Sequence, residues 1–227
     1  MKTVRKFITV TLLISAFAVS LSANAQEKEV RKIQASITVL KEFGKMKESI
    51  PSQLLEMTEG IIIIPKMINA GLVVGGKRGK GLAMVKDASG KWSDPVFVTL
   101  TGGSFGFQAG VQAVDLVLIF KNKETLLNIS KSSFTLGGDI SVAAGPLGRS
   151  STASTDSKLE AEVYSYSRSK GLFAGISLSG AALEIDNAAI ADFYGHAESS
   201  KTLFSGSSKA SSSDVTTLKS TLNGLYQ

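Results

Sequence analysis

From residue 71 onward the chain is a succession of short apolar runs separated by glycines, and this pattern limits the fold more than any other. Each run has the length of one strand, and no regular helical segments alternate with the runs as crossover connections would require. Such a pattern predicts an antiparallel sheet, and glycines inside strands suit the sharp bends of a sheet that curls or closes. The strands are expected at Leu72–Val74, Leu82–Val85, Val96–Leu100, Phe105–Ala109, Val114–Phe120, Asp139–Ala144, Glu162–Ser167, Leu172–Leu178 and Ala182–Ile185.

An amphipathic helix is predicted from about Glu27 to Phe43. Its apolar residues recur at steps of three and four, and charged residues lie between them. Such a stripe favours packing on a sheet, and a helix lying on a membrane surface is the alternative. The fold class is therefore predicted as α+β, with a curled or barrel-like antiparallel β-sheet, an N-terminal amphipathic helix and short covering helices. Those short helices are expected at Pro51–Met57, Lys123–Ile129 and Asn187–Tyr194, and a buried strand is expected at Ile61–Ile64.

The N-terminus has the pattern of a secretory signal peptide. Three basic residues among the first six precede an apolar run from Phe7 to Leu21, and a small-x-small site ends at Ala25. We expect cleavage after Ala25 and a periplasmic or secreted protein, and an uncleaved anchor is the alternative. The predicted division is a signal peptide over 1–25, one domain over 26–204, a serine-rich linker over 205–213 and a short C-terminal helix over 214–227. That helix is expected to dock on the domain or on a partner.

Composition limits the chemistry that this chain can perform. It contains no cysteine, which excludes a disulfide framework, a thiolate nucleophile and a cysteine-ligated metal. Of its 25 basic residues three precede the apolar run, which leaves 22 against 19 acidic residues. That excess is too small for a nucleic-acid-binding surface, so no nucleic-acid partner is expected. The single histidine, His196, has no second imidazole with which to share a metal ion, so neither a metal nor another cofactor is expected.

One segment matches the G-x-S-x-G nucleophile elbow of serine hydrolases. It is Gly102–Gly106, with Ser104 at its centre and His196 downstream. An elbow needs a strand before the serine and a helix after it, whereas the residues that follow here are glycine-rich and strand-like. We therefore interpret the segment as a glycine-rich strand bend and expect no catalytic residues. A serine hydrolase that uses Ser104 and His196 is the remote alternative.

A second glycine-rich segment, Gly75–Gly81, carries the cations Lys77, Arg78 and Lys80. Its spacing matches neither a P-loop nor a dinucleotide-binding loop. We predict a tight cationic hairpin whose backbone amides and positive side chains suit a phosphate headgroup, and a solvated hairpin tip without a ligand is the alternative. Further candidates for anion or lipid binding are Arg168 and Lys170 in a predicted basic turn, and Arg31 and Lys32 on the N-terminal helix.

Several short segments rich in glycine and aromatic residues follow one another in a specific order. They are WSDP at Trp92–Pro95, GSFGFQAG at Gly103–Gly110, VDLVLIF at Val114–Phe120, GPLGR at Gly145–Arg149, YSYS and GLFAG within Tyr164–Gly175, and DFYG at Asp192–Gly195. This succession resembles the SYLF domain family over roughly residues 50–195. The resemblance implies a non-enzymatic domain that binds membrane phospholipids, which are phosphoinositides in eukaryotic relatives, and some of those relatives also bind actin. Lipid contact in the family involves basic and amphipathic surfaces that include the N-terminal helix, which maps here onto Lys28, Arg31 and Lys32.

The predicted export signal changes which partner is expected. A periplasmic or secreted protein does not meet actin filaments, and phosphoinositides are not expected there either. The expected partner is therefore an anionic phospholipid or another envelope lipid, bound at a membrane surface. A protein-interaction module of the envelope, tethered through the C-terminal helix, is the alternative.

Overall fold

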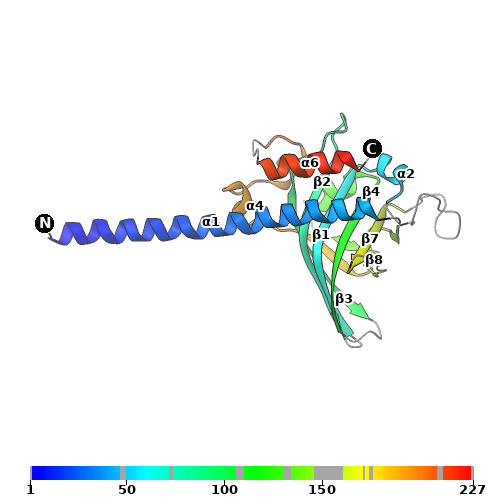
Figure 1. Cartoon of the computed structure of the whole chain (residues 1–227), viewed down its shortest axis with the longest axis horizontal. Coiled ribbons are helices and arrows are strands. Elements are labelled where there is room, and N and C mark those ends of the chain that lie inside the picture. Colours follow the sequence, from blue (N-terminus) through cyan, green and yellow to red (C-terminus); the bar gives the residue numbers. More distant parts are fainter. Residues whose placement is uncertain are drawn as a thin grey trace.

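The computed structural model describes residues 2–46, 50–71, 74–105, 110–129, 134–145, 161–170, 172–173, 176–208 and 212–225 (Figure 1). The helices in these residues are α1 (Lys2–Lys45), α2 (Ser52–Glu56), α3 (Lys123–Ile129), α4 (Asn187–Tyr194), α5 (Ser200–Phe204) and α6 (Ser213–Gly224). The strands are β1 (Gly60–Gly71), β2 (Val74–Val85), β3 (Val96–Phe105), β4 (Gly110–Phe120), β5 (Phe134–Leu136), β6 (Val142–Ala144), β7 (Val163–Ser169), β8 (Leu172–Phe173) and β9 (Ala181–Ile185).

All the strands belong to one sheet, in the order β5-β9-β3-β2-β1-β4-β7-β6, with β8 paired to β7. Long β-branched and aliphatic runs form its centre, where β1 pairs with β2 on one side and with β4 on the other. The strand pairs are antiparallel except β6 with β7, which is parallel. The sheet is therefore mixed, and the prediction of a wholly antiparallel sheet was wrong at this one edge.

The two edges of the sheet meet, so the sheet curls nearly into a barrel. Strands β5 and β6 stand at opposite ends of the strand order, yet only residues 137–141 separate them along the chain. An isolated bridge also pairs Leu136 of β5 with Ile140, just before β6. So short a connection requires the two edges to lie close together. The predicted α+β fold with a curled, barrel-like sheet is confirmed.

The centre of the sheet is buried on both faces. In β1 the four consecutive residues Ile61–Ile64 are at most 1% exposed, although alternate residues of a strand point to opposite faces. Helix α1 lies across the outer face and contacts β1 and β2, whereas α3 contacts β2, β4 and β9 and closes one end of the interior. On the outer side α6 packs against α1 (Figure 1). The predicted helix at Glu27–Phe43 is thus part of α1 and packs on the sheet.

Helix α1 is longer than the predicted amphipathic helix because it also includes the apolar N-terminal run. Its N-terminal part projects beyond the sheet in Figure 1. Among the residues that the structure describes, no helix combines the length and the apolar character needed to cross a membrane. The cleavage after Ala25 stays a prediction.

The local predictions were confirmed for several helices and were less accurate for strands. The strand expected at Leu172–Leu178 is present only as β8 in the described residues, that expected at Asp139–Ala144 only as β6, and β5 and α5 were not predicted. Helices α3 and α4 have the predicted bounds, and a helix is present at the C-terminus. The expected tight hairpin at Gly75–Gly81 was wrong, because these residues lie inside the continuous strand β2, paired with β1 and β3. The expected strand at Phe105–Ala109 falls almost wholly outside the described residues, and only Phe105 is seen, at the end of β3.

Candidate functional site

The three cations of β2 point to opposite faces of the sheet. Lys77 and Gly79 face the interior, where a Cβ atom at Gly79 would meet the side chains of Ile64 and Met67. Lys77 is only 5% exposed, and its ammonium group donates a hydrogen bond to the carbonyl oxygen of Ser177. Burial lowers the pKa of Lys77, because a low-dielectric surrounding disfavours the charged form. Lys77 therefore does not share a surface with the other two cations.

Lys80 faces outward and is held by Asp186. The Lys80 Nζ atom lies 2.6 Å from Asp186 Oδ2, and the hydroxyl of Thr99 donates to the same oxygen at 3.3 Å. Asp186 also caps α4, since its Oδ1 accepts from the Ala189 amide at 3.2 Å. Burial alone would raise the pKa of Asp186, but the hydrogen bonds from Lys80 and Ala189 and the nearby positive charges lower it overall.

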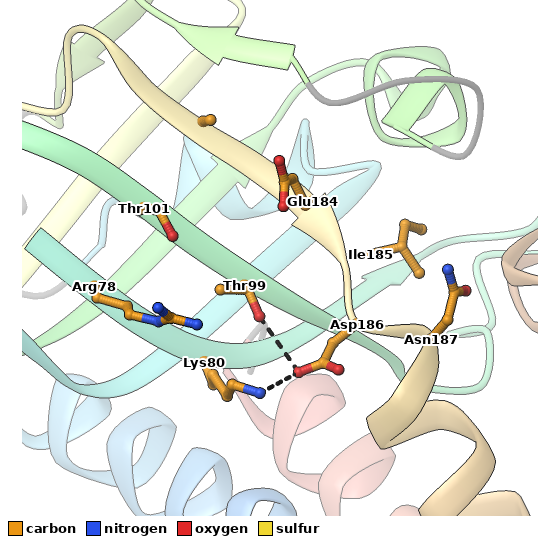
Figure 2. A pocket seen from close by; sticks show the side chains of 9 residues that line it. Arg78, Lys80, Thr99, Thr101, Glu184, Ile185, Asp186 and Asn187 are labelled. Carbon is orange, nitrogen blue, oxygen red and sulfur yellow. Dashed lines mark hydrogen bonds and ion pairs between the residues drawn. The ribbon is translucent and has the colours of Figure 1, made fainter.

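A hollow of about 500 Å³ opens on the outer face of β2, β3 and β9, next to the start of α4 (Figure 2). The strand register places Arg78 beside Thr101, and Lys80 beside Thr99, which in turn pairs with Glu184. Arg78 and Glu184 are exposed, and neither forms an ion pair with any residue that the structure describes. The lining residues are Arg78, Lys80, Thr99, Thr101, Ala182, Glu184, Ile185, Asp186 and Asn187.

A second surface, which we call the basic rim, lies on the hairpin end of β1 and β4 beyond α1. Three of the four large hydrophobic side chains that are exposed in the described residues are Ile68, Val111 and Leu172, which are 44%, 76% and 73% exposed. Ile68 and Val111 lie on the outer face of β1 and β4, whereas Leu172 pairs with Ser169 at the edge formed by β7 and β8. Ile68 pairs with Arg78 on one side and with Ala113 on the other. The rim also carries two exposed lysines. It comprises Lys66, Ile68, Arg78, Val111, Lys170 and Leu172.

The two lysines of the rim have an unusual backbone. Lys66 and Lys170 are the described residues other than glycine with positive φ, at 49° and 50°. Lys66 follows Pro65 at the irregular register of β1, where its amide donates to Asp115 Oδ1 at 3.0 Å. Lys170 turns the chain from β7 into β8. A side chain in this left-handed conformation costs about 1 kcal/mol, so glycine would be less strained than lysine at both positions.

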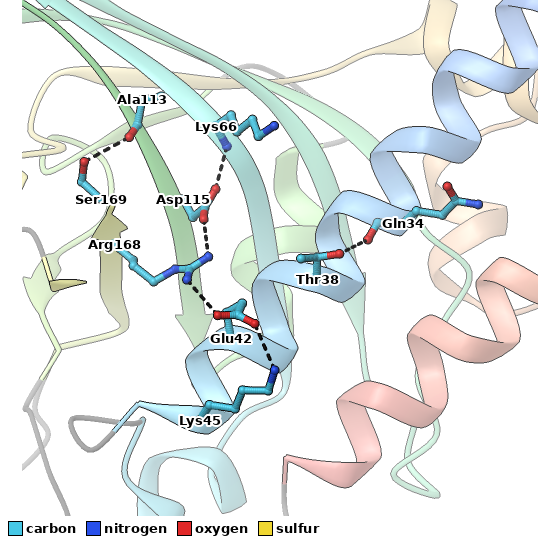
Figure 3. Close-up of polar contacts among 9 residues, drawn as sticks. All are labelled: Gln34, Thr38, Glu42, Lys45, Lys66, Ala113, Asp115, Arg168 and Ser169. Carbon is cyan, nitrogen blue, oxygen red and sulfur yellow. Dashed lines mark hydrogen bonds and ion pairs between the residues drawn. The ribbon is translucent and has the colours of Figure 1, made fainter. Parts of the chain in front are cut away.

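Arg168, expected to be a free cation in a turn, is instead part of a polar network under α1 (Figure 3). Its guanidinium donates to Asp115 at 2.7 Å and to Glu42 of α1 at 3.4 Å, and its side chain is 13% exposed. Lys45 donates a hydrogen bond to Glu42 at 3.1 Å. This hydrogen bond and the positive charges of Lys45 and Arg168 lower the pKa of Glu42. This network ties α1 to β4 and β7.

The two basic residues of α1 also differ in their surroundings. Arg31 is exposed and pairs with Glu27 one turn earlier on the same helix. Lys32 pairs with the buried Glu29 and lies 5.5 Å above the ring of Phe97, so it faces the sheet. Among the candidates from the sequence, the structure brings Arg78 and Lys80 to one hollow, and places Lys170 at the turn after β7, three strands away from Arg78 in the strand order.

The nucleophile elbow considered for a serine hydrolase is not formed at Ser104. Ser104 lies within β3, where its backbone pairs with Gly75 of β2, so the serine stands in a strand rather than on a turn between a strand and a helix. His196 lies on the surface, with Nε2 3.1 Å from Glu198 Oε2. The described residues also include no cluster of acidic or histidine side chains that suits a metal ion.

Sequence reasoning missed the two acids of the hollow. Asp186 had a signal, since an aspartate directly before a predicted helix is a typical N-cap. Glu184 had none, because its role depends on the pairing of β9 with β3, which places it beside Thr99, more than 80 positions earlier in the chain.

Comparison with known proteins identifies the family of this chain. Residues 101–225, more than half of the chain, match the family model Ysc84, described as Las17-binding protein actin regulator. The chain is 34% identical over 188 residues to LAS seventeen-binding protein 3 of Saccharomyces cerevisiae, covering 82% of this chain and 41% of that protein. It is 32% identical over 160 residues to the SH3 domain-containing YSC84-like protein 1 of Homo sapiens, covering 70% of this chain and 46% of that protein.

The Xenopus laevis protein of the same name is 31% identical over 172 residues, 75% of this chain and 51% of its own length. The chain thus spans about half or less of the curated relatives that it matches. The extent of the family match, together with the glycine and aromatic segments in their expected order, shows that this chain belongs to the Ysc84 family, whose domain is also known as SYLF.

Proposed function

We propose that this chain is a non-enzymatic domain that binds membranes containing anionic phospholipid and does so through the basic rim. The observation that carries the proposal is the concentration of exposed apolar side chains and unpaired cations at one end of the sheet. Apolar side chains exposed beside cations are typical of surfaces that enter the headgroup layer of a membrane. Each cation near an anionic surface contributes about 1 kcal/mol, so the three of the rim act together.

The strained lysines support the same proposal. Lys66 and Lys170 both have positive φ, and Lys170 follows Ser169, whose hydroxyl donates to the carbonyl of Ala113 near Ile68. Backbone strain of this kind clusters at functional sites. Attraction of anionic headgroups would be such a function.

The rim replaces part of the binding site expected from the sequence. Lys77 faces the interior, and Lys80, Arg168 and Lys32 are each paired with a carboxylate, which reduces the attraction that they offer to a headgroup. We therefore assign lipid contact to Arg78 and Lys170, as expected, and add Lys66. Arg31 stays a peripheral candidate on the solvent side of α1.

The place of action follows from the N-terminal pattern. We propose that the chain is exported, is cleaved after Ala25, and works at the envelope. Gln26 donates a hydrogen bond to the carbonyl of Phe193 at 3.4 Å, so α1 contacts the domain at the first residue after the proposed cleavage site. A phospholipid of the envelope is then a more accessible partner than actin.

Sedimentation with vesicles tests the proposal. The double variant Lys66→Gln/Lys170→Gln should bind phosphatidylglycerol vesicles roughly ten- to thirtyfold more weakly, since two contributions of about 1 kcal/mol are lost. Val111→Ser/Leu172→Ser should also weaken binding, and its effect should persist in high salt. The matched control is Lys91→Gln/Lys201→Gln, which removes two exposed lysines away from the rim and should bind as the parent does.

Equal pelleting of the parent, both rim variants and the control would refute the rim as the membrane contact. A protein partner is the second candidate, because relatives carry the name Las17-binding protein. The apolar side of α6 does not serve as its tether, since Val215, Leu218 and Leu222 are buried. The protein-partner candidate would be favoured if the parent bound a soluble protein that the rim variants did not bind, and if the parent bound no vesicles.

A further inference from the structure

We infer that the hollow on β2, β3 and β9 is a subsite for a zwitterionic group that joins a phosphate to a primary ammonium, as in phosphoethanolamine. Arg78 and Thr101 would hold the phosphate, and Glu184 and Asn187 would hold the ammonium. The inference deepens the proposed membrane binding by naming a headgroup class, and its test in solution does not depend on that proposal.

The charges of the hollow favour a zwitterion over a simple anion. Its lining includes two cations and two carboxylates, so its formal charge is zero. Lys80 and Asp186 satisfy each other at 2.6 Å, and Asp186 is further held by Thr99 and by the start of α4. The groups left over are one guanidinium and one carboxylate, Arg78 and Glu184. A ligand that satisfies both must carry one charge of each sign.

The spacing of these two groups agrees with such a ligand. Arg78 lies on β2 and Glu184 on β9, with β3 between them, and the register offsets them by two residues along the strands. Neighbouring strands are about 4.8 Å apart, so the two Cα atoms are separated by roughly two strand spacings plus that offset. Because side chains of a strand stand roughly perpendicular to the sheet, the two charged groups stay about that far apart and leave room for a phosphate and an ammonium joined by a two-carbon link. Figure 2 shows the threonines of β3 between Arg78 and Glu184.

Each polar group of the hollow has a suitable counterpart. A guanidinium binds phosphate oxygens with two hydrogen bonds, and the hydroxyl of Thr101 is directly beside it in the register. A primary ammonium offers three donors, which match the Glu184 carboxylate and the Asn187 side-chain oxygen. A trimethylated ammonium offers no donor, so phosphocholine should bind less well.

The hollow is also next to the rim. Arg78 belongs to both surfaces, because it pairs with Ile68 of β1 on one side and with Thr101 of β3 on the other. A membrane reached by the rim would therefore present headgroups at the open side of the hollow. The same chemistry occurs in free phosphoethanolamine esters, and the experiment separates these two sources.

The soluble arm is a titration of ¹⁵N-labelled protein, followed by NMR, with three compounds. Glycerophosphoethanolamine should shift amides of β2, β3 and β9 and bind at least about tenfold more tightly than glycerophosphocholine or glycerol 3-phosphate. Glu184→Gln should abolish this preference while leaving the weak binding of glycerol 3-phosphate unchanged. Arg78→Gln should weaken all three compounds, and the control Lys91→Gln should weaken none. Equal affinity for the ethanolamine and choline compounds, or no shifts at all, would overturn the inference.

The vesicle arm distinguishes the sources and separates the two proposals. A preference of the parent for phosphatidylethanolamine over phosphatidylcholine vesicles, lost in Glu184→Gln, would identify a lipid headgroup. Selective binding of the soluble compound without any pelleting would support the hollow as a site for a free ester and refute the membrane proposal. Pelleting with phosphatidylglycerol vesicles, with no ethanolamine preference in either arm, would refute the hollow and leave the membrane proposal standing.

Discussion

Asp186 joins three parts of the molecule through one carboxylate. It accepts from Lys80 of β2, from Thr99 of β3 and from the Ala189 amide at the start of α4. Its pKa lies below the ordinary value because these donors outweigh the effect of burial. A group whose pKa is lowered on folding stabilises the folded state above its unfolded pKa, near 3.9. That contribution is lost as the pH falls through the folded pKa.

The variant Asp186→Asn tests this assignment, because asparagine keeps an N-cap acceptor and loses the charge. We expect the free energy of unfolding at pH 7 to fall by about 1 kcal/mol, a modest value because Lys80 is partly exposed. The difference from the parent should shrink as the pH falls below about 4, where the parent carboxylate is also protonated. Urea unfolding at several pH values measures it, with Asp192→Asn on the exposed side of α4 as control. A difference that does not depend on pH would contradict the ionic role.

The sequence analysis expected Lys77 to be exposed, and the physical reason for this error lies in the residues around it. Four of the seven residues in Gly75–Gly81 are glycines and carry no side chain. The face that each strand residue occupies is predicted from the alternation of apolar and polar side chains along the sequence. Glycine has no side chain, so a glycine-rich strand does not show this alternation. Positive charge suggested exposure for all three cations, whereas the pairing of β2 with β1 and β3 turns Lys77 inward.

Strand β2 requires glycine at the positions where β1 approaches it closely. The pairing of β1 with β2 shifts in register between Ile63 and Ile68. At that shift a Cβ atom on Gly81 would overlap the carbonyl of Ile63, whereas one on Gly76 would come no closer than 3.8 Å to any atom beyond its chain neighbours. The glycines therefore serve close approach between strands rather than a turn.

Gly81→Ala and Gly76→Ala form a matched pair on one strand. We expect Gly81→Ala to lower the free energy of unfolding by about 2 to 3 kcal/mol, because the added methyl group displaces the backbone of β1. Gly76→Ala should be neutral or stabilise by about 0.5 kcal/mol, since alanine restricts the unfolded chain. Urea unfolding of both variants gives the comparison. If the two variants had equal free energies of unfolding, β1 could move away from residue 81 at no cost, and this would contradict the proposal that glycine is required there for close approach.

Elements with a strong local pattern were predictable, and elements that depend on a neighbour were not. Helices α3 and α4 were found at their bounds because each has apolar periodicity and a clear start. Strand β5 has three residues, too few to show a period, and it exists because β9 offers it an edge to pair with. The parallel pairing of β6 also depends on the closure of the whole sheet, which no local pattern records.

At the scale of the whole molecule, α1 is the outer layer of the core. Its apolar stripe, Ile33, Ile37, Leu40 and Phe43, is at most 7% exposed, and α6 and the Arg168 network hold it in place. Releasing α1 onto a membrane would expose that stripe and the sheet beneath it, at about 1.5 to 3 kcal/mol for each large side chain. Membrane binding through the rim requires no such release. The two modes therefore predict different behaviour when α1 is fixed.

Fixing α1 to α6 distinguishes them, and the absence of native cysteine makes the experiment specific. The Gln34 Nε2 atom lies 3.0 Å from Asp214 Oδ1, so Gln34→Cys and Asp214→Cys place two thiols within reach of a cleavable bis-maleimide. We expect the crosslinked protein to sediment with phosphatidylglycerol vesicles as the uncrosslinked variant does, because the rim lies beyond α1. Each single-cysteine variant treated in the same way is the control. Binding that is lost on crosslinking and regained on cleavage would show that α1 itself must leave the sheet to reach the lipid.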